Sequence, residues 1–177
     1  MHSFKTLASL FLLASISVSN AYPTDAAPES SIVERGLTIA VGTDAKSASC
    51  PYTNNNLPDA NPQLPARIYA AHDYTQNQVK KAMLSAAQLQ VDDKQIGAQG
   101  YPHAFGNGEK LPFPCGSKRF EFPIQPDNDI YSGGAVTDLP DRVVYEYSAD
   151  KTTAKINFCG VMRHGPPPAN DFLLCKS

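Results

Sequence analysis

The clearest repeat of hydrophobic positions in the chain runs from residue 75 to residue 92. Apolar residues recur there every three or four positions, as on the buried face of a helix; they are Val79, Ala82, Met83, Ala86 and Leu89. Thr75 can cap the first turn, and Asp92, Asp93 and Gly97 follow the last apolar position. The pattern predicts one helix between these ends, with a polar face that is simply solvated.

After Gly100 the pattern changes to short β-type runs separated by Gly, Pro and Asp. We expect strands in four of them, which are FEFPI from residue 120, RVVYEY from residue 142, KINFCGVMRH from residue 155 and FLLC from residue 172. In the first run Phe120 and Phe122 share one face and Glu121 lies on the other, because successive side chains of a strand point in opposite directions. One helix followed by such strands predicts an α+β fold, with the helix packed on a twisted antiparallel sheet.

The first 21 residues have the pattern of a secretory signal peptide. His2 and Lys5 precede an apolar run that ends at Val18, and small residues surround Ala21, after which we place cleavage. The run is too short and too interrupted by serine for a transmembrane helix. We therefore expect a secreted, extracellular protein with no membrane partner.

The rest of the chain divides into a sparse N-terminal arm and one domain. Residues 22–48 are rich in Ala, Ser, Pro and Thr with scattered acids, so they bury little and are interpreted as a pro-segment or flexible arm. Residues 49–177 are long enough for one compact domain with a single core, which we expect to be a monomer.

All four cysteines lie in this predicted domain; they are Cys50, Cys115, Cys159 and Cys175. In an exported chain an even number of cysteines predicts two disulfides, and their spacing leaves three pairings open. No CxxC pair and no close His/Cys spacing favours a zinc site, so we expect neither a metal nor a cofactor. The formal net charge of −2 shows no basic excess for binding along a polyanion, because each phosphate contact needs a Lys or Arg.

Four ionisable side chains stand within or at the ends of the apolar runs; they are His103, Glu121, Arg142 and His164. Charges are rare in such runs unless a partner or a ligand compensates them. Each one taken alone could be structural. Together they are the groups that cleave an RNA phosphodiester without a metal: a base for the 2′-hydroxyl, an acid for the leaving 5′-oxygen and a cation for the phosphate. We therefore predict that they share one site.

Six short blocks carry a more specific resemblance. In chain order they are YPH, FEFPI, DIYSGG, DRVVY, CGVMRH and NDFLLC, between residues 101 and 175. This series resembles the fungal guanyl-specific ribonucleases, whose fold is shared by ribotoxins such as sarcin and restrictocin. The resemblance implies that Glu121 is the general base, His164 the general acid and His103 a histidine that assists the base. It also implies three further residues at the scissile phosphate, which are Arg142, Tyr101 and Phe172.

The resemblance implies a guanine-binding loop after His103. Phe105 matches the aromatic residue that stacks on the base, and Glu109 matches the glutamate that accepts from the base's N1 and N2. The other implied base contacts are Gly106, Asn107, Gly108 and, from a distant segment, Asn170. The family usually has a second asparagine and a lid tyrosine where this chain has Gly106 and Gly108, so the departure predicts weaker base binding and relaxed specificity.

The family pattern also selects one of the three disulfide pairings. Cys50 with Cys175 would tie the two ends of the domain together, as across the family. Cys115 with Cys159 resembles the second bridge of ribotoxins and of purine-preferring relatives.

The sequence therefore predicts a metal-independent endoribonuclease that cleaves single-stranded RNA after guanine or purines. The implied reaction is transesterification through a 2′,3′-cyclic phosphate, which needs the RNA 2′-hydroxyl and so leaves DNA uncut.

One alternative is a ribotoxin that cuts a single phosphodiester of large-subunit ribosomal RNA. Ribotoxins are typically basic with long lysine-rich insertions, whereas only 17 residues separate His103 from Glu121 here. Another is a ribonuclease-like effector that binds RNA or a host protein without cutting, which the complete set of implied catalytic residues disfavours.

Overall fold

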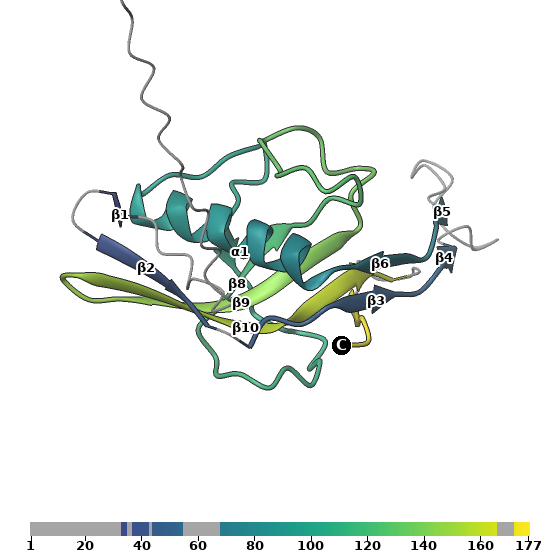
Figure 1. Ribbon diagram of the computed structural model, residues 1–177. Helices are drawn as coiled ribbons and strands as arrows, with labels where there is room; N and C mark the ends of the chain where they lie inside the picture. Colours follow the sequence, from purple (N-terminus) through teal and green to yellow (C-terminus); the bar gives the residue numbers. More distant parts are fainter. Residues whose placement is uncertain (1–32, 35–36, 43, 55–67, 166–171) are drawn as a thin grey trace, which may run out of the picture.

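The computed structural model places one helix across a broad sheet (Figure 1). It describes residues 33–34, 37–42, 44–54, 68–165 and 172–177. The predicted signal peptide lies outside the described residues. The elements in chain order are β1 (Val33–Glu34), β2 (Leu37–Val41), β3 (Ala48–Cys50), β4 (Thr53–Asn54), β5 (Ile68–Tyr69), β6 (His72–Tyr74), α1 (Gln76–Val91), β7 (His103–Ala104), β8 (Arg119–Pro123), β9 (Asp141–Ala149), β10 (Thr153–His164) and β11 (Phe172–Leu174).

The main sheet has the strand order β1-β2-β10-β9-β8-β7, and β11 pairs with the end of β10. Its pairings are antiparallel except that of β2 with β10, which is parallel. Two small ladders, β3 with β6 and β4 with β5, extend beside it. The predicted α+β fold is confirmed, and each of the four predicted strand runs forms a strand of the main sheet.

Helix α1 forms where the hydrophobic repeat predicts it. The side-chain hydroxyl of Thr75 accepts from the backbone N–H of Gln78, and the Gln78 side chain accepts from the backbone N–H of Thr75, which completes a capping box. The helix ends with Asp92 as its C-cap. Its buried residues face the sheet and belong to the main core; they are Val79, Ala82, Met83, Ala86 and Ala87. The helix prediction is confirmed at both ends.

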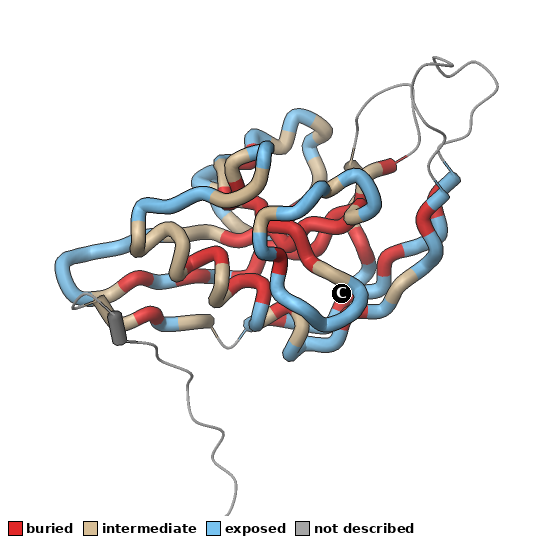
Figure 2. The backbone as a smooth tube through the Cα atoms, turned by 90° about the horizontal axis from the view of Figure 1, so that it is seen from above, coloured by how far each residue is buried: buried red, intermediate tan, exposed pale blue. Residues whose placement is uncertain are grey.

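The two faces of the sheet carry different side chains because residues alternate along each strand. Phe122, Val143 and Tyr145 face α1 and belong to the main core. Val144, between the last two of these, belongs instead to a smaller core on the opposite face. Figure 2 shows that the buried residues run along the middle of the molecule, with exposed loops around them. The smaller core supports the loop that follows β7, and with it the candidate site.

Segment 22–48, interpreted above as a pro-segment or flexible arm, contributes strand β2 to the main sheet. Residues Thr38 to Val41 pair in parallel with Thr153 to Ile156 of β10, and Ile39 is buried in the main core. Ala45 and Ala48 are buried as well. The second half of this segment is therefore part of the folded domain, while removal of any part of it on maturation stays a prediction.

Both disulfides form with the pairing that the family resemblance implies. Cys50–Cys175 joins residues 125 positions apart, and Cys115–Cys159 joins residues 44 positions apart. The first ties β3 to the residue after β11, and the second ties the loop after β7 to β10. The described helix, α1, is neither long nor apolar enough to cross a membrane.

Replacing Cys50 and Cys175 together by alanine is expected to lower the free energy of unfolding by about 2–5 kcal/mol, because the bridge restricts the unfolded chain. The matched change of Cys115 and Cys159 is expected to cost about 1 kcal/mol less, since it opens a shorter loop. Urea unfolding of the two double variants measures the difference. A larger loss from opening the shorter loop would contradict the chain-entropy explanation.

Candidate active site

The first two predicted site residues face each other on neighbouring strands. His103 in β7 is the Cα partner of Glu121 in β8, and the histidine Nε2 lies 3.2 Å from the glutamate Oε1. The imidazole is one-third exposed (33%), whereas the carboxylate side chain is only 7% exposed. A buried carboxylate therefore sits beneath an imidazole that solvent can reach.

Next to this pair lies a buried cation, the guanidinium of Arg142, which contacts Tyr101. The guanidinium Nε donates to the Tyr101 hydroxyl at 3.0 Å, and Nη1 donates to the carbonyls of Leu139 and Asp141. The Tyr101 ring also stacks on the His103 ring, with centroids 4.7 Å apart. The peptide bond between Tyr101 and Pro102 is cis. Tyr101 thus joins the cation to the imidazole, and Arg142, only 1% exposed, is fixed in direction.

His164 lies at the end of β10 on the same face of the sheet as Arg142. Met162 pairs with Arg142, and His164 follows two positions later, so their side chains share one face. His164 pairs with Phe172 of β11, and their ring centroids are 4.1 Å apart. Phe172 in turn meets the edge of Phe105, in the predicted base loop, at 5.9 Å. The aromatic residues therefore connect the second histidine to the base loop.

Burial raises the pKa of Glu121, and this is the largest influence on it. His103 and Arg142 lower its pKa by opposite charge, while the nearby Glu109 raises it. The Oε2 oxygen is buried and has no hydrogen-bond partner among the described residues. A carboxylate in this state is a stronger base than an exposed one.

We expect Glu121→Gln to raise the melting temperature at pH 7. A carboxyl pKa raised by burial means that ionisation favours the unfolded state, so this group's contribution to stability falls as pH rises through its folded pKa. The neutral amide removes that cost. Thermal unfolding checks the sign, with Glu146→Gln, a half-buried acid on β9, as the matched control. A lower melting temperature for Glu121→Gln than for the wild type would contradict the burial argument.

The loop from residue 104 to residue 111 is braced from within by Asn107. This residue has a positive φ of 51°, its amide nitrogen donates to the Leu111 carbonyl and its amide oxygen accepts from the Leu111 N–H. Phe105 is buried between the edges of Phe113 and Phe172. Asn107 thus shapes the loop through its side chain.

The outer side of this loop is open. A Cβ atom built on Gly106 or Gly108 would meet no atom within 4 Å, and Glu109, which follows Gly108, is half-exposed. The charge of Glu109 acts on Glu121, which puts the loop beside the catalytic candidates. Asn170 lies outside the described residues. The register of the strands puts His103, Glu121, Arg142 and His164 on one face of the sheet. Ring contacts link Phe172 and Phe105 to His164, and Tyr101 contacts Arg142.

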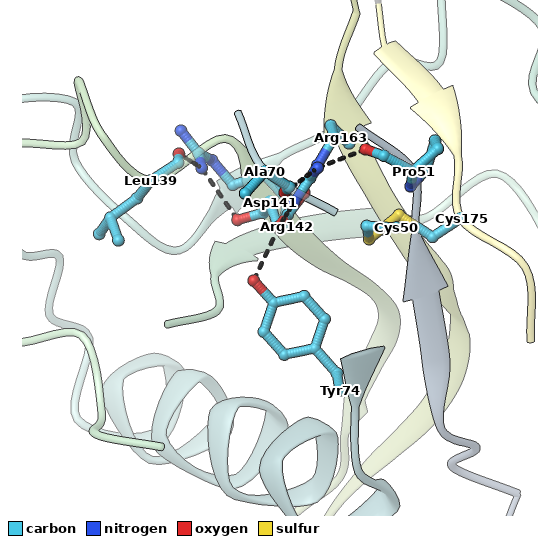
Figure 3. A network of polar contacts seen from close by, with 9 residues as sticks. All are labelled: Cys50, Pro51, Ala70, Tyr74, Leu139, Asp141, Arg142, Arg163 and Cys175. Carbon is cyan, nitrogen blue, oxygen red and sulfur yellow. Dashed lines mark hydrogen bonds and ion pairs between the residues drawn. A yellow bond between two sulfur atoms is a disulfide. The ribbon is translucent and has the colours of Figure 1, made fainter. Parts of the chain in front are cut away.

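A buried polar network that the sequence analysis missed lies under this face (Figure 3). Arg163 and Asp141 form an ion pair with Nε and Oδ1 2.7 Å apart, and the Tyr74 hydroxyl donates to Asp141 Oδ2 at 2.7 Å. Arg163, like Arg142, is a charge inside an apolar run. Arg163 could therefore have been identified from the sequence by the same argument that identified Arg142. Among the described residues one cluster has metal-ligand spacing, Cys50, Asp141 and Cys175, but its two sulfurs form the disulfide.

Comparison with known proteins places the chain beside RNA-cleaving enzymes. A family model described as ribonuclease matches residues 44–176. The chain is 31% identical to guanyl-specific ribonuclease T1 of Aspergillus oryzae over 119 residues, which cover 63% of this chain and 85% of that protein. It is 28% identical to guanyl-specific ribonuclease Pc of Penicillium chrysogenum over 102 residues, covering 58% and 89%. With guanyl-specific ribonuclease Ms of Aspergillus phoenicis it shares 34% identity over 77 residues, covering 44% and 65%.

Proposed function

Because this chain belongs to the ribonuclease family, whose model matches residues 44–176, we propose that it is a metal-independent endoribonuclease that cleaves single-stranded RNA after guanine or purines. The observation that carries the proposal is the buried Glu121 paired with His103 at 3.2 Å, beside the fixed guanidinium of Arg142. Relatives named as guanyl-specific ribonucleases support the choice of base.

The proposed first step is a transesterification within the RNA. Glu121, assisted by His103, takes the proton of the 2′-hydroxyl, and the 2′-oxygen attacks the neighbouring phosphorus. Arg142 and Tyr101 hold the phosphate and offset the charge that builds on its oxygens. His164 gives its proton to the departing 5′-oxygen, so the bond to the next nucleotide breaks. The products are a 2′,3′-cyclic phosphate and a free 5′-hydroxyl.

The second step reverses the two proton transfers. His164, now neutral, takes a proton from a water molecule that attacks the cyclic phosphate, and Glu121 returns its proton to the 2′-oxygen. The result is a 3′-phosphate. DNA lacks the 2′-hydroxyl that starts the reaction, so it is not a substrate in this mechanism.

We place the base at the open side of the loop that contains Gly106 and Gly108. Glu109 accepts from the Watson–Crick edge of guanine, and Phe105, Asn107 and Asn170 complete the site in this proposal. The open space at Gly106 and Gly108 supports the relaxed specificity that we expect, because neither position carries a side chain that could cover the base.

Gly108→Tyr is expected to lower KM for guanine-containing dinucleotides on the order of tenfold, because stacking on one more aromatic ring is worth about 1–3 kcal/mol per base. The space above Gly108 accepts the new side chain. Gly134→Tyr, also at a position with open space but outside this loop, is the matched control. Steady-state kinetics on dinucleotides with each base measure the effect. An equal change in KM for both variants would contradict the placement of the base.

Incubation with intact ribosomes separates general RNA cleavage from a ribotoxin. We expect progressive degradation of ribosomal RNA, because the chain carries a net charge of −2 and has no basic excess for docking on the ribosome. A single discrete large-subunit fragment would contradict the proposal and favour the toxin. RNA that stays intact would favour an effector that binds without cutting.

We further propose that the protein is secreted, with cleavage after Ala21 and action as a monomer outside the cell. Both disulfides are consistent with an oxidising compartment. Sequencing the N-terminus of protein from culture medium tests this. The pairing of β2 with β10 leads us to expect that the residues from Leu37 onward remain in the mature chain.

A further inference from the structure

The buried ion pair between Arg163 and Asp141 lies where the ends of β9 and β10 pair in the sheet. The two residues are Cα partners in β10 and β9, and each directly precedes a proposed active-site residue, His164 and Arg142. Because successive side chains point to opposite faces, the ion pair lies on the helix side, beneath the face that carries Arg142 and His164. The ion pair therefore joins the ends of β9 and β10 on the face opposite Arg142 and His164.

Every nitrogen of the Arg163 guanidinium has a partner. Nε and Nη2 each donate to one oxygen of Asp141 at 2.7 Å, a bidentate contact. Nη1 donates to the carbonyls of Ala70, at 2.7 Å, and Pro51. Pro51 directly follows Cys50 of the first disulfide, and Ala70 lies between β5 and β6 (Figure 3). Arg163 therefore ties the end of β10 to two segments outside the main sheet.

We propose that Arg163 is a positioning residue: through its pair with Asp141 it fixes where Arg142 and His164 lie relative to one phosphate. This inference rests on the proposed function of those two residues. Burying two charges carries a desolvation cost that largely offsets their attraction, so net stability is a poor explanation for a pair that is 1% exposed on both sides. The ion pair does provide a rigid link directly below the two reactive groups. A pair of apolar side chains would not provide such a link.

The ion pair acts where β9 and β10 pair, next to the two proposed active-site residues. The His164 N–H donates to the Pro140 carbonyl just before β9. Arg142 donates from Nη1 to the Leu139 and Asp141 carbonyls and from Nε to the Tyr101 hydroxyl. On the helix side, Arg163 and Tyr74 add side-chain contacts that reach two segments outside the main sheet. Displacement of a reacting group by about 1 Å can cost on the order of 100-fold in rate.

The test compares three variants with the wild type. Arg163→Lys keeps the charge but loses the bidentate fork, and the double variant Asp141→Asn with Arg163→Gln removes both charges so that none is left uncompensated. Met83→Ala, at a fully buried position on α1, is the control for a loss of stability alone. Steady-state kinetics on a guanine-containing dinucleotide are measured well below the lowest melting temperature, and the His164 imidazole signal is followed by NMR through a pH titration.

We expect kcat to fall about 10-fold to 100-fold in both Arg163 variants, with KM changed less than about twofold because the base loop is untouched. The His164 signal and its titration midpoint are expected to shift in these variants. Met83→Ala is expected to lose thermal stability with kcat and the His164 signal unchanged.

Three results would overturn the inference: an unchanged kcat in the Arg163 variants, an unchanged His164 signal, or an equal loss of kcat in Met83→Ala. If the double variant fails to fold, Arg163→Lys decides the question alone. A wild-type protein that cleaves no RNA would defeat the proposed function instead, and the His164 signal would still decide whether Arg163 positions that side chain.

Discussion

Glu121→Gln is expected to reduce kcat/KM for RNA by a factor on the order of 10² to 10⁴, the usual contribution of a general base. Glutamine nearly matches glutamate in size, so the contact with His103 and the packing of β8 are kept. The amide cannot take a proton from the 2′-hydroxyl. The remaining activity is expected to depend on His103, which can act as a base in part.

The pH profile makes this prediction more specific. In the wild type, activity is expected to fall on the acid side as Glu121 becomes protonated, with a midpoint above the ordinary carboxyl pKa of 4.5 because burial raises it. In Glu121→Gln this acid limb is expected to move, since His103 replaces the carboxylate as base. Glu146→Gln is the control and is expected to keep the wild-type profile. An acid limb that is identical in all three proteins would show that Glu121 is not the base.

His164→Gln is expected to cause a loss of similar size, on the order of 10² or more in kcat/KM, because the 5′-oxygen would then leave without a proton. The size of the loss should depend on the leaving group. A nucleoside leaves as a strongly basic alkoxide, whereas a p-nitrophenolate leaves readily without protonation. A guanosine 3′-(p-nitrophenyl phosphate) substrate is therefore expected to recover most of the lost rate.

The same substrate provides the control for this prediction. Glu121→Gln should remain slow with p-nitrophenolate as leaving group, because the 2′-hydroxyl still needs a base. Comparing the two variants on the two substrates separates the acid from the base. Equal losses for His164→Gln on both substrates would contradict its role as the proton donor.

The sequence was most informative where local signals decide the structure. The apolar repeat and Thr75 predict α1 because helix formation depends on neighbours three and four positions away. The strand runs at residues 120, 142, 155 and 172 were recognisable from alternation and β-propensity. Their site residues were recognisable because charges in apolar runs need partners, and because the family resemblance gives each one a role.

The sequence was least informative where the structure depends on contacts between segments that are distant in the chain. The run LTIAV from Leu37 to Val41 is short and lies among small polar residues, so only its parallel pairing with β10 reveals it as a strand. Asp141 and Arg163 are far apart in the chain, and their bidentate contact depends on the register of β9 and β10. Each of these features depends on tertiary partners that no local pattern encodes.

The central claim is that the carboxylate, the imidazoles and the guanidinium on this face act together on one RNA phosphate. The most direct measurement is product analysis of guanylyl-(3′→5′)-cytidine incubated with the purified protein in EDTA, beside the same dinucleotide with a 2′-deoxyguanosine. The account predicts guanosine 2′,3′-cyclic phosphate and free cytidine from the ribose substrate, and no reaction of the deoxy substrate. Absence of the cyclic phosphate, or cleavage of the deoxy substrate, would contradict it.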